Sequence, residues 1–541
     1  MVSVDTSYTL KWREQAWSKL TKGDSKGLHE WDVLVIGGGI TGAGIAREAA
    51  RRKLTVALID QRDFAWGTSS RSSKMVHGGL RHLMAGHLKL TYDLVRERER
   101  LLHEVPGLVN PLGFLFTDYK GRFPGHWSFN ALLTTYDLLA RRWNHRYYKA
   151  REYMLLAPRV ASTDLKGGVR YTDAVTNDAR LVLRVIQEAK CDGALAINYV
   201  AADQLIRQGN KVCGVAVRDV ITGETAEVHA KVVVNATGAW ADRLRKQAGG
   251  GSNIRPLRGS HLVFPFWRLP IAQAFGLMHP VDRRSVFLLP WEGATVVGNT
   301  DLDHDEDLDS EPHTTPQEVD YLLEIVQYQF PNLGIKREDI LSTYAGVRPV
   351  IGTGALNPSK ERRNHSIWVE NGLISVSGGK LTNFRLIALD VLRRVARCIP
   401  SFTISNRGDP VFRKLSEQAP DLGGLDSTLR RYLIGRYGEK AIEVVNYARE
   451  GELSRVPGTD TLWAELRWAA HNEAVVHLDD LLFRRSNLGI LLQKGGLAFF
   501  DHLQAICRDE LGWDTNCWER EANNFKALWN ECYSVPEVSA Q

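Results

Sequence analysis

Residues 31–60, WDVLVIGGGITGAGIAREAARRKLTVALID, decide the fold. They open with the apolar run WDVLVI, which is typical of a buried strand, and pass through a glycine cluster into a helix-like stretch from Ile40 to Lys53. A second strand-like run, LTVALID, follows and ends at Asp60. Because a strand, a helix and a second strand in this order form a βαβ unit, we expect a parallel sheet with the helix packed across it.

The glycine cluster matches the dinucleotide-binding pattern G-x-G-x-x-G with Gly37, Gly39 and Gly42. Side chains at the first two positions would obstruct the approach of backbone N–H groups to a pyrophosphate at the helix N-terminus. Asp60 lies 23 residues after Gly37, at the end of the second strand, where it can accept hydrogen bonds from a ribose. An acidic residue there disfavours a 2′-phosphate, which argues against NADP. A glycine-rich turn without a ligand is the alternative.

A second glycine motif chooses between FAD and NAD. Residues 232–240, VVVNATGAW, run from an apolar strand into ATG, which contains Gly238. This stretch resembles the motif found downstream of the first fingerprint in two-dinucleotide-binding flavoproteins, and it favours FAD. No attachment motif is evident, so we expect the FAD to be non-covalent.

Length and composition indicate a packed, multidomain enzyme. The chain has 541 residues, 44% of them hydrophobic and 24% charged, and is long enough for two or three domains. The net charge of +6 is slight for this length, and we find no basic run interleaved with exposed aromatic residues, so no nucleic-acid partner is expected. The six cysteines are scattered without metal-ligand spacing, which predicts reduced thiols and no metal site. No apolar run reaches about 18 residues, so any membrane contact is expected to be peripheral.

Residues 1–30 form a polar extension with one amphipathic stripe at helical spacing, made of Leu10, Arg13, Trp17 and Leu20. We expect this stripe to dock on the protein's own body; lying on a membrane surface is the alternative. Residues 401–424 are rich in Gly, Pro, Ser and charge and predict a linker. Strand signals vanish after it, so residues 425–541 are expected to form a helical domain, with helical spacing from Leu462 to Leu482.

Strands and helices alternate between residues 31 and 400. Strands are expected at Val232–Asn235, Val286–Leu289, Thr295–Gly298 and Gly372–Ser377. The stretch Thr315-Pro316-Gln317-Glu318 predicts a helix start, with Thr315 as cap and Glu318 completing a capping box.

Several further blocks occur together in one order. They are TSSRSSK at 68–74, HGGLR at 77–81, YTD at 171–173, DARL at 178–181, RGSH at 258–261, LPW at 289–291, GNTD at 298–301, GVRP at 346–349, GGKLT at 378–382, LDD at 478–480 and RR at 484–485. Together they closely resemble the FAD-dependent glycerol-3-phosphate dehydrogenase family over about residues 31–500. One departure is His82, where the family often has Tyr.

The resemblance implies an α/β fold of the D-amino-acid-oxidase-like flavoprotein superfamily. Its FAD-binding Rossmann-type domain would be assembled from about residues 31–105, 165–250 and 340–400, with a mainly antiparallel substrate domain between these segments and an α-helical C-terminal domain. It also implies hydride transfer from C2 of sn-glycerol 3-phosphate to FAD, giving dihydroxyacetone phosphate, with electrons passing to a membrane quinone. We therefore expect a cytoplasmic protein held peripherally at the inner face of the membrane, and count a homodimer among its expected partners.

The resemblance also assigns site residues. The cofactor set adds Thr68, Ser69, Ser73, His77, Gly78, Gly238, Gly379 and Thr382 to Gly37, Gly39, Gly42 and Asp60. The substrate set is Arg81, Thr300, Asp301, Arg348, Arg363 and Lys380, since a phosphomonoester with roughly 1.5 to 2 negative charges needs cations. His77, Arg348 and Lys380 are the expected catalytic groups, because the C2 hydroxyl loses a proton while its hydride leaves. His77 is the first candidate base and His261 the second.

Other readings compete with this one. An oxidase that returns electrons to oxygen, an amino-acid oxidase on the same fold and a non-catalytic flavin-bearing interaction module are the alternatives. The acidic stretch from Asp301 to Asp309 imitates an EF-hand loop, but Glu306 replaces the required glycine and Pro312 the last glutamate. A solvated acidic loop is expected there instead.

Overall fold

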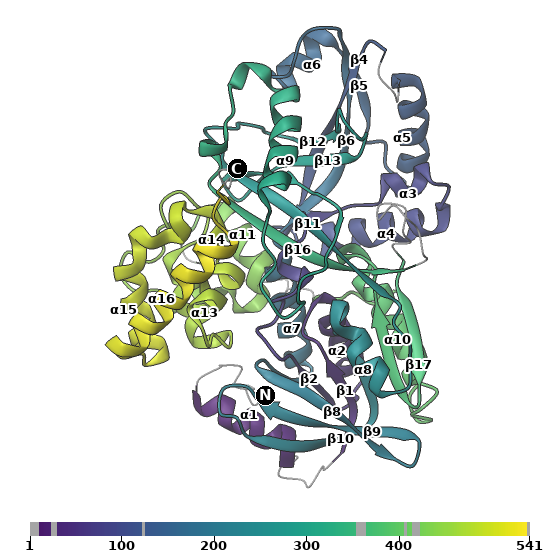
Figure 1. Cartoon of the computed structure of the whole chain (residues 1–541), viewed down its shortest axis with the longest axis vertical. Helices are drawn as coiled ribbons and strands as arrows, with labels where there is room; N and C mark the ends of the chain where they lie inside the picture. Colours follow the sequence, from purple (N-terminus) through teal and green to yellow (C-terminus); the bar gives the residue numbers. More distant parts are fainter. Residues whose placement is uncertain are drawn as a thin grey trace.

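The computed structural model of the protein describes residues 10–22, 30–121, 125–352, 364–404, 408–413, 422 and 424–537. The side chains of Leu10, Lys11 and Arg81 lie outside this description, as does the whole of Arg363, a predicted substrate residue. Two sheets stand one above the other, and the helical C-terminal part lies beside them (Figure 1).

The lower sheet has eight strands and contains the predicted βαβ unit. β1 (Glu30–Ile36) lies between β2 (Val56–Ile59) and β10 (Thr225–Asn235) and is parallel to both. α2 (Ile40–Ala50) connects β1 to β2, so the βαβ prediction is confirmed. The other strands are β7 (Leu195–Ile197), β8 (Val200–Gln208), β9 (Lys211–Asp219), β17 (Ser366–Glu370) and β18 (Leu373–Ser377).

β1 is covered on both faces, and its residues alternate between two cores. Val33 and Val35 pack with α2, α7 (Asp178–Cys191) and α10 (Phe384–Val395). Leu34 and Ile36 pack on the other face with the β8–β9 hairpin and with α1 (Leu10–Lys22). The continuous apolar run of β1 is the pattern of a parallel strand buried on both faces.

α1 docks on the protein's own body. Trp17 and Leu20 are 8% and 2% exposed. Arg13 donates a 2.8 Å hydrogen bond to the backbone oxygen of Asn198 and forms a 3.0 Å ion pair with Asp219. The expected docking is confirmed, and the alternative that Trp17 and Leu20 lie on a membrane is wrong because both side chains are inside the fold.

The upper sheet has ten strands and is mainly antiparallel. Its strands are β3 (Met75–Val76), β4 (Val109–Tyr119), β5 (Arg146–Lys149), β6 (Leu165–Thr176), β11 (Ile254–Pro265), β12 (Ala274–Met278), β13 (Ser285–Trp291), β14 (Ala294–Gly298), β15 (Leu302–Asp303) and β16 (Ser342–Ile351). β12 and β4 form its parallel pair. The four predicted strand stretches are confirmed as parts of β10, β13, β14 and β18, except that Gly372 lies in the turn before β18.

Helices cover the upper sheet. α9 (Pro316–Gln329) begins at the predicted capping box, in which the Thr315 hydroxyl accepts from the Glu318 amide at 3.3 Å and the Glu318 carboxylate accepts from the Thr315 amide at 3.1 Å. The other helices outside the C-terminal part are α3 (Leu80–Met84), α4 (Leu88–Glu104), α5 (His126–Ala140), α6 (Ala150–Leu156) and α8 (Ala241–Gln247).

The C-terminal part is helical. Its helices are α11 (Ser427–Tyr437), α12 (Ala441–Asn446), α13 (Trp463–Asn472), α14 (Leu488–Leu491), α15 (Phe500–Leu511) and α16 (Thr515–Cys532). The helical pattern predicted up to Leu482 is interrupted after Asn472. The Asp480 carboxylate accepts from the amides of Val476 and His477 at 2.8 and 2.9 Å, and starts a separate π-helical turn.

A buried ion network joins the helical part to the lower sheet. The Asp63 carboxylate accepts hydrogen bonds from the guanidinium groups of Arg484 and Arg485, the latter at 2.8 Å. All three side chains are buried. Although burial opposes it, the two guanidinium groups lower the pKa of Asp63 to about 2. Arg180 of α7 donates to Glu473 at 2.9 Å and closes the same interface.

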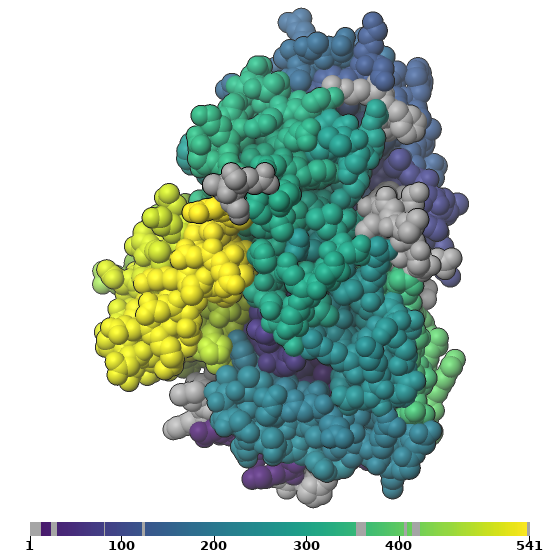
Figure 2. Space-filling model, viewed as in Figure 1, coloured from purple at the N-terminus to yellow at the C-terminus, as the bar shows by residue number. Residues whose placement is uncertain are grey.

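An open cleft of about 1100 Å³ lies where the two sheets and the helical part meet, with Trp66, Tyr199, Ser310 and Leu528 on its walls (Figure 2). No helix within the described ranges is both long and apolar enough to cross a lipid bilayer.

Candidate active site

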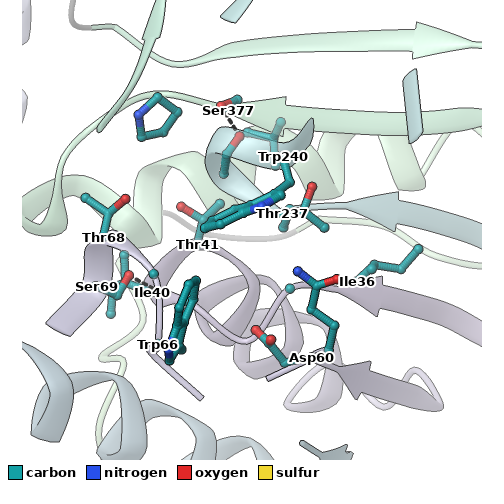
Figure 3. A pocket seen from close by; sticks show the side chains of 18 of the residues that line it. Ile36, Ile40, Thr41, Asp60, Trp66, Thr68, Ser69, Thr237, Trp240 and Ser377 are labelled. Carbon is teal, nitrogen blue, oxygen red and sulfur yellow. Dashed lines mark hydrogen bonds between the residues drawn. The ribbon is translucent and has the colours of Figure 1, made fainter. Parts of the chain in front are cut away.

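A cavity of about 390 Å³ opens at the carboxyl ends of β1, β2, β10 and β18 (Figure 3). Ligands of open α/β sheets bind at this edge, because the loops that follow the strands gather there. Eight predicted site residues line the cavity: Gly37, Gly39, Asp60, Thr68, Ser69, Gly238, Gly379 and Lys380. They come from four segments of the chain that are far apart in the sequence.

The glycine turn is a cradle that side chains would fill. Gly37 has φ +110°, and a Cβ there would lie 2.5 Å from the Ala236 backbone oxygen. A Cβ on Gly42 would lie 1.8 Å from the Gly37 oxygen, so Gly42 lets α2 approach the strand. The hydroxyl of Ser69 accepts from the Ile40 amide at 3.0 Å in the first turn of α2. The turn therefore fits a pyrophosphate at the positive end of this helix.

Asp60 stands at the cavity wall with both oxygens oriented by backbone amides. It accepts from Gly38 at 2.6 Å and from Arg62 at 2.9 Å. Burial is the main reason that the pKa of Asp60 is raised to about 7, against an ordinary value of 3.8. Hydroxyl donors from a ribose would stabilise its charged form, so the residue fits the predicted role.

Residues that the sequence argument missed complete the cavity. Thr41, Trp66, Thr237, Trp240 and Ser377 line it. The rings of Trp66 and Trp240 are 5.8 Å apart. Thr237 and Trp240 belong to the stretch 232–240 already singled out, so taking the residues on both sides of Gly238 as cofactor candidates would have found them.

The loop after Thr68 ties the cavity to the upper sheet. The Thr68 hydroxyl donates to the Val347 backbone oxygen in β16. The His77 amide donates to the Thr382 hydroxyl at 3.2 Å, while the Gly78 amide donates to Asp173 at 3.2 Å. The structure thus brings His77 and Gly78 next to Thr382, although none of them lines the cavity.

The His77 ring also contacts its own loop. Its Nδ1 accepts a 3.1 Å hydrogen bond from the Gly79 amide. In the neutral ring the proton then lies on Nε2, because an accepting nitrogen carries none. This form of His77 is a hydrogen-bond donor at Nε2 and differs from the predicted base.

Two of the predicted substrate cations, Lys380 and Arg348, lie at the cavity wall or next to a residue that lines it. Lys380 lines the cavity, and its Nζ would lie 3.6 Å from a Cβ on Gly79. Arg348 precedes Pro349, another lining residue, and its guanidinium pairs with the Asp301 carboxylate. Asp301 is 3.6 Å from Arg284 as well, so this cluster of one carboxylate and two guanidiniums keeps a net positive charge.

The predicted role of Thr300 needs correction. Its hydroxyl donates to the Glu318 carboxylate at 2.6 Å and accepts from the Ser260 amide at 2.8 Å. Only 3% of Thr300 is exposed, so its side chain anchors β11 to α9 and does not face a substrate. Asp301 is 4% exposed and serves Arg348 as a counter-charge.

His261, the second candidate base, is buried on β11. Its Nε2 lies 2.8 Å from the Ser73 hydroxyl, and its ring stacks on Tyr344 with 4.5 Å between centroids. Burial first, and the charges of Lys74 and Arg348 next, hold the pKa of His261 well below its ordinary value. The ring is neutral at physiological pH.

The acidic stretch after Asp301 is exposed to solvent, as expected, and several of its carboxylates are ion-paired at the surface. Asp303 pairs with Arg255, while Glu306 pairs with Arg258 at 2.9 Å. Asp309 pairs with Arg243 at 2.8 Å. In the described part of the chain, no group of three His, Cys, Asp or Glu side chains is arranged to hold a metal ion.

Comparison with known proteins identifies the family. Residues 32–388 match the family model for FAD dependent oxidoreductases, and residues 404–517 match the model for the C-terminal domain of alpha-glycerophosphate oxidase. The aerobic glycerol-3-phosphate dehydrogenase of Staphylococcus haemolyticus is 36% identical over 483 residues, which are 84% of this chain and 86% of that protein. The chain belongs to the FAD-dependent glycerol-3-phosphate dehydrogenases. The recognition of this family from the sequence blocks is confirmed.

Solved structures agree with this membership. The glycerol-3-phosphate dehydrogenase of Bacillus halodurans, solved with FAD, is 28% identical, has a TM-score of 0.76 and covers 98% of this chain and 99% of its own. The L-alpha-glycerophosphate oxidase of Mycoplasma pneumoniae, 17% identical with a TM-score of 0.57 over 72% of this chain and all of its own, shares the fold. The predicted α/β flavoprotein fold of this glycerol-3-phosphate dehydrogenase family member is confirmed. The prediction of FAD as its cofactor is confirmed as well.

Proposed function

We propose that this chain oxidises sn-glycerol 3-phosphate at C2 to dihydroxyacetone phosphate. The observation that carries the proposal is the pair of cations, Arg348 and Lys380, beside the cofactor cavity of a chain 36% identical to an aerobic glycerol-3-phosphate dehydrogenase. Bound FAD supplies the hydride acceptor for this reaction.

The chain's own part is first to hold the phosphate. Each charge-assisted hydrogen bond to a phosphate oxygen contributes about 1.5 to 3 kcal/mol. Asp301 holds Arg348 from one side, which fixes the guanidinium before the substrate arrives. Lys380 offers a second charge from the loop before α10, so the two cations approach the substrate from different sheets. Arg81 and Arg363 remain predicted substrate residues.

The cofactor would be held by the glycine cradle and the loop beside it. The proposed set is Gly37, Gly39, Gly42, Asp60, Thr68, Ser69, Ser73, His77, Gly78, Gly238, Gly379 and Thr382. With Nδ1 occupied by the Gly79 amide, His77 would donate from Nε2 to the oxygen that develops negative charge at C2, and the proton of the C2 hydroxyl would leave to water. We propose non-covalent FAD.

We further propose that electrons leave for a membrane quinone and that the protein associates peripherally with the inner face of the cytoplasmic membrane. The second candidate is an oxidase that delivers the electrons to oxygen. The match of residues 404–517 to a domain model named for alpha-glycerophosphate oxidase is the observation that favours it.

Product analysis tests the reaction and the acceptor together. The purified holoenzyme is given glycerol 3-phosphate with a soluble quinone analogue or with air, and dihydroxyacetone phosphate and peroxide are measured. We expect the ketone product with the quinone analogue and little peroxide in air. Fast, stoichiometric peroxide formation would select the oxidase, and no ketone with either acceptor would reject the proposed reaction.

A further inference from the structure

A short basic and aromatic segment follows α5. Residues 140–151 read ARRWNHRYYKAR, with five Arg or Lys and no Asp or Glu. The expectation that no basic run carries exposed aromatic residues is wrong here. Arg141, Arg142, Trp143, Arg146 and Lys149 are all exposed, and Trp143 is 69% exposed.

The outer face of α5 continues this surface. Trp127, Ala131 and Leu138 recur at helical spacing, are all exposed, and therefore share one face of the helix. Trp127 is 80% exposed and Leu138 67%. The buried face of α5, with Leu133 and Tyr136, packs inward, so the apolar outer residues are not needed for the protein's own core.

The neighbouring helix α3 widens the apolar surface. α5 contacts both α3 and α4, and Figure 1 shows these helices on the outer side of the upper sheet. Met84 and Leu88, at the end of α3 and the start of α4, are 54% and 57% exposed. We call Met84, Leu88, Trp127, Leu138 and Trp143, with the cations of residues 141–151, the α5 surface.

We propose that the α5 surface docks this protein on an anionic lipid membrane, a placement that rests on the proposed membrane quinone. Protruding tryptophans and leucines suit the interface between headgroups and acyl chains, and clustered cations attract anionic headgroups. Charge selects this occupant, because the exposed cations Arg141, Arg146 and Lys149 complement a negative surface, while Arg142 is paired with Glu99 at 3.2 Å. A soluble polyanion would bind through charge alone and would make no use of the exposed Leu88 and Leu138, whereas a membrane would contact both.

The position of this surface relative to the cavity fits the proposal. α4 contacts Leu381–Asn383, directly after Lys380, and α3 starts directly after Gly79, which lies against Lys380. Docking through the α5 surface would therefore bring the Lys380 end of the cavity near the lipid phase, where a lipophilic acceptor is dissolved.

Vesicle sedimentation of the full-length holoenzyme tests the surface. Vesicles of phosphatidylcholine alone are compared with vesicles containing phosphatidylglycerol. One variant combines Arg141→Glu with Arg146→Glu, and another combines Trp127→Ser with Trp143→Ser. The matched controls are Lys336→Glu with Arg508→Glu, and Trp267→Ser, all at exposed positions outside α3–α6, with Lys336, Arg508 and Trp267 69%, 68% and 79% exposed.

We expect binding to the anionic vesicles only, weakened by high salt. The charge variant should lose about fivefold for each cation removed, and the aromatic variant should bind more weakly than Trp267→Ser. Equal binding of both variants and their controls would overturn the proposal. So would a change in their oligomeric state by light scattering without any vesicle binding, which would make this face a contact between proteins. Activity with a soluble dye is measured alongside, so that loss of the proposed function and loss of docking are distinguished.

Discussion

At the scale of single residues, we propose that Asp60 sets how tightly the cofactor is held. The pKa of Asp60 is raised to about 7 by burial, so the carboxyl begins to protonate as the pH falls through neutrality. The charged form is the better acceptor for ribose hydroxyls, since in the neutral form a proton occupies one of the two carboxyl oxygens. The same shift means that, without FAD, the folded chain binds this proton more tightly than the unfolded chain. Asp60 therefore costs stability as the pH rises from about 4 to 7.

FAD affinity should consequently fall as the pH drops below about 7. Asp60→Asn should bind FAD more weakly at pH 8, by about 1 to 3 kcal/mol, and should lose this pH dependence. Flavin fluorescence in equilibrium dialysis between pH 5.5 and 8.5 measures both effects. An Asn variant that keeps the wild-type pH profile would show that another group titrates.

Arg348 and Lys380 should govern the binding of the phosphate. Replacing either with Ala should lower kcat/KM for glycerol 3-phosphate, with a loss of about 1.5 to 3 kcal/mol of transition-state stabilisation, while FAD content stays intact. Arg508→Ala, at an exposed position on α15, is the control. If the variants and the control keep the same kcat/KM, the phosphate site lies elsewhere.

At the scale of elements, α1 is a structural brace. Its Leu20 is buried under the lower sheet, so Leu20→Ala should lower the free energy of unfolding by about 2 to 5 kcal/mol. Vesicle binding should not change. Denaturant unfolding and sedimentation measure the two quantities. A loss of vesicle binding with unchanged stability would mean that the α1 stripe binds the membrane.

How far the sequence predicts an element depends on how local its cause is. The βαβ unit and the α9 cap follow from spacing along the chain, because glycines, apolar runs and the Thr315–Glu318 box act within a few residues. The destination of α1 does not, since docking inward and lying on a membrane need the same amphipathic stripe. The burial of Trp17 and Leu20 and the partners of Arg13, about 200 residues away, distinguish the two.

In the site too, features with local causes could be predicted from the sequence and features set by distant residues could not. Sequence blocks assembled most of the cavity wall, because cofactor loops follow strands at one sheet edge. The side-chain direction of Thr300 could not be predicted, since it is set by Glu318 on a helix of the other layer. The coupling of His77 Nδ1 to Gly79 is likewise a matter of loop conformation, which residue types alone do not reveal.

At the scale of the whole molecule, the network around Asp63 holds the helical part against the lower sheet. Asp63→Asn would leave two buried guanidiniums without their shared carboxylate, and should cost about 3 to 5 kcal/mol. Because the pKa of Asp63 is lowered to about 2, the stability it provides is present above about pH 4 and is lost as the pH falls toward 2. Calorimetry of both proteins between pH 2 and 7 checks this. A variant as stable as the wild type would make the interface independent of these charges.

We propose that this cavity holds FAD next to cations that select glycerol 3-phosphate. Anaerobic titration of the purified holoenzyme, followed by flavin absorbance, tests it most directly. We predict that about one equivalent of glycerol 3-phosphate per flavin bleaches the absorbance, and that glycerol at the same concentration does not. Bleaching by both compounds alike, or by neither, would contradict the claim.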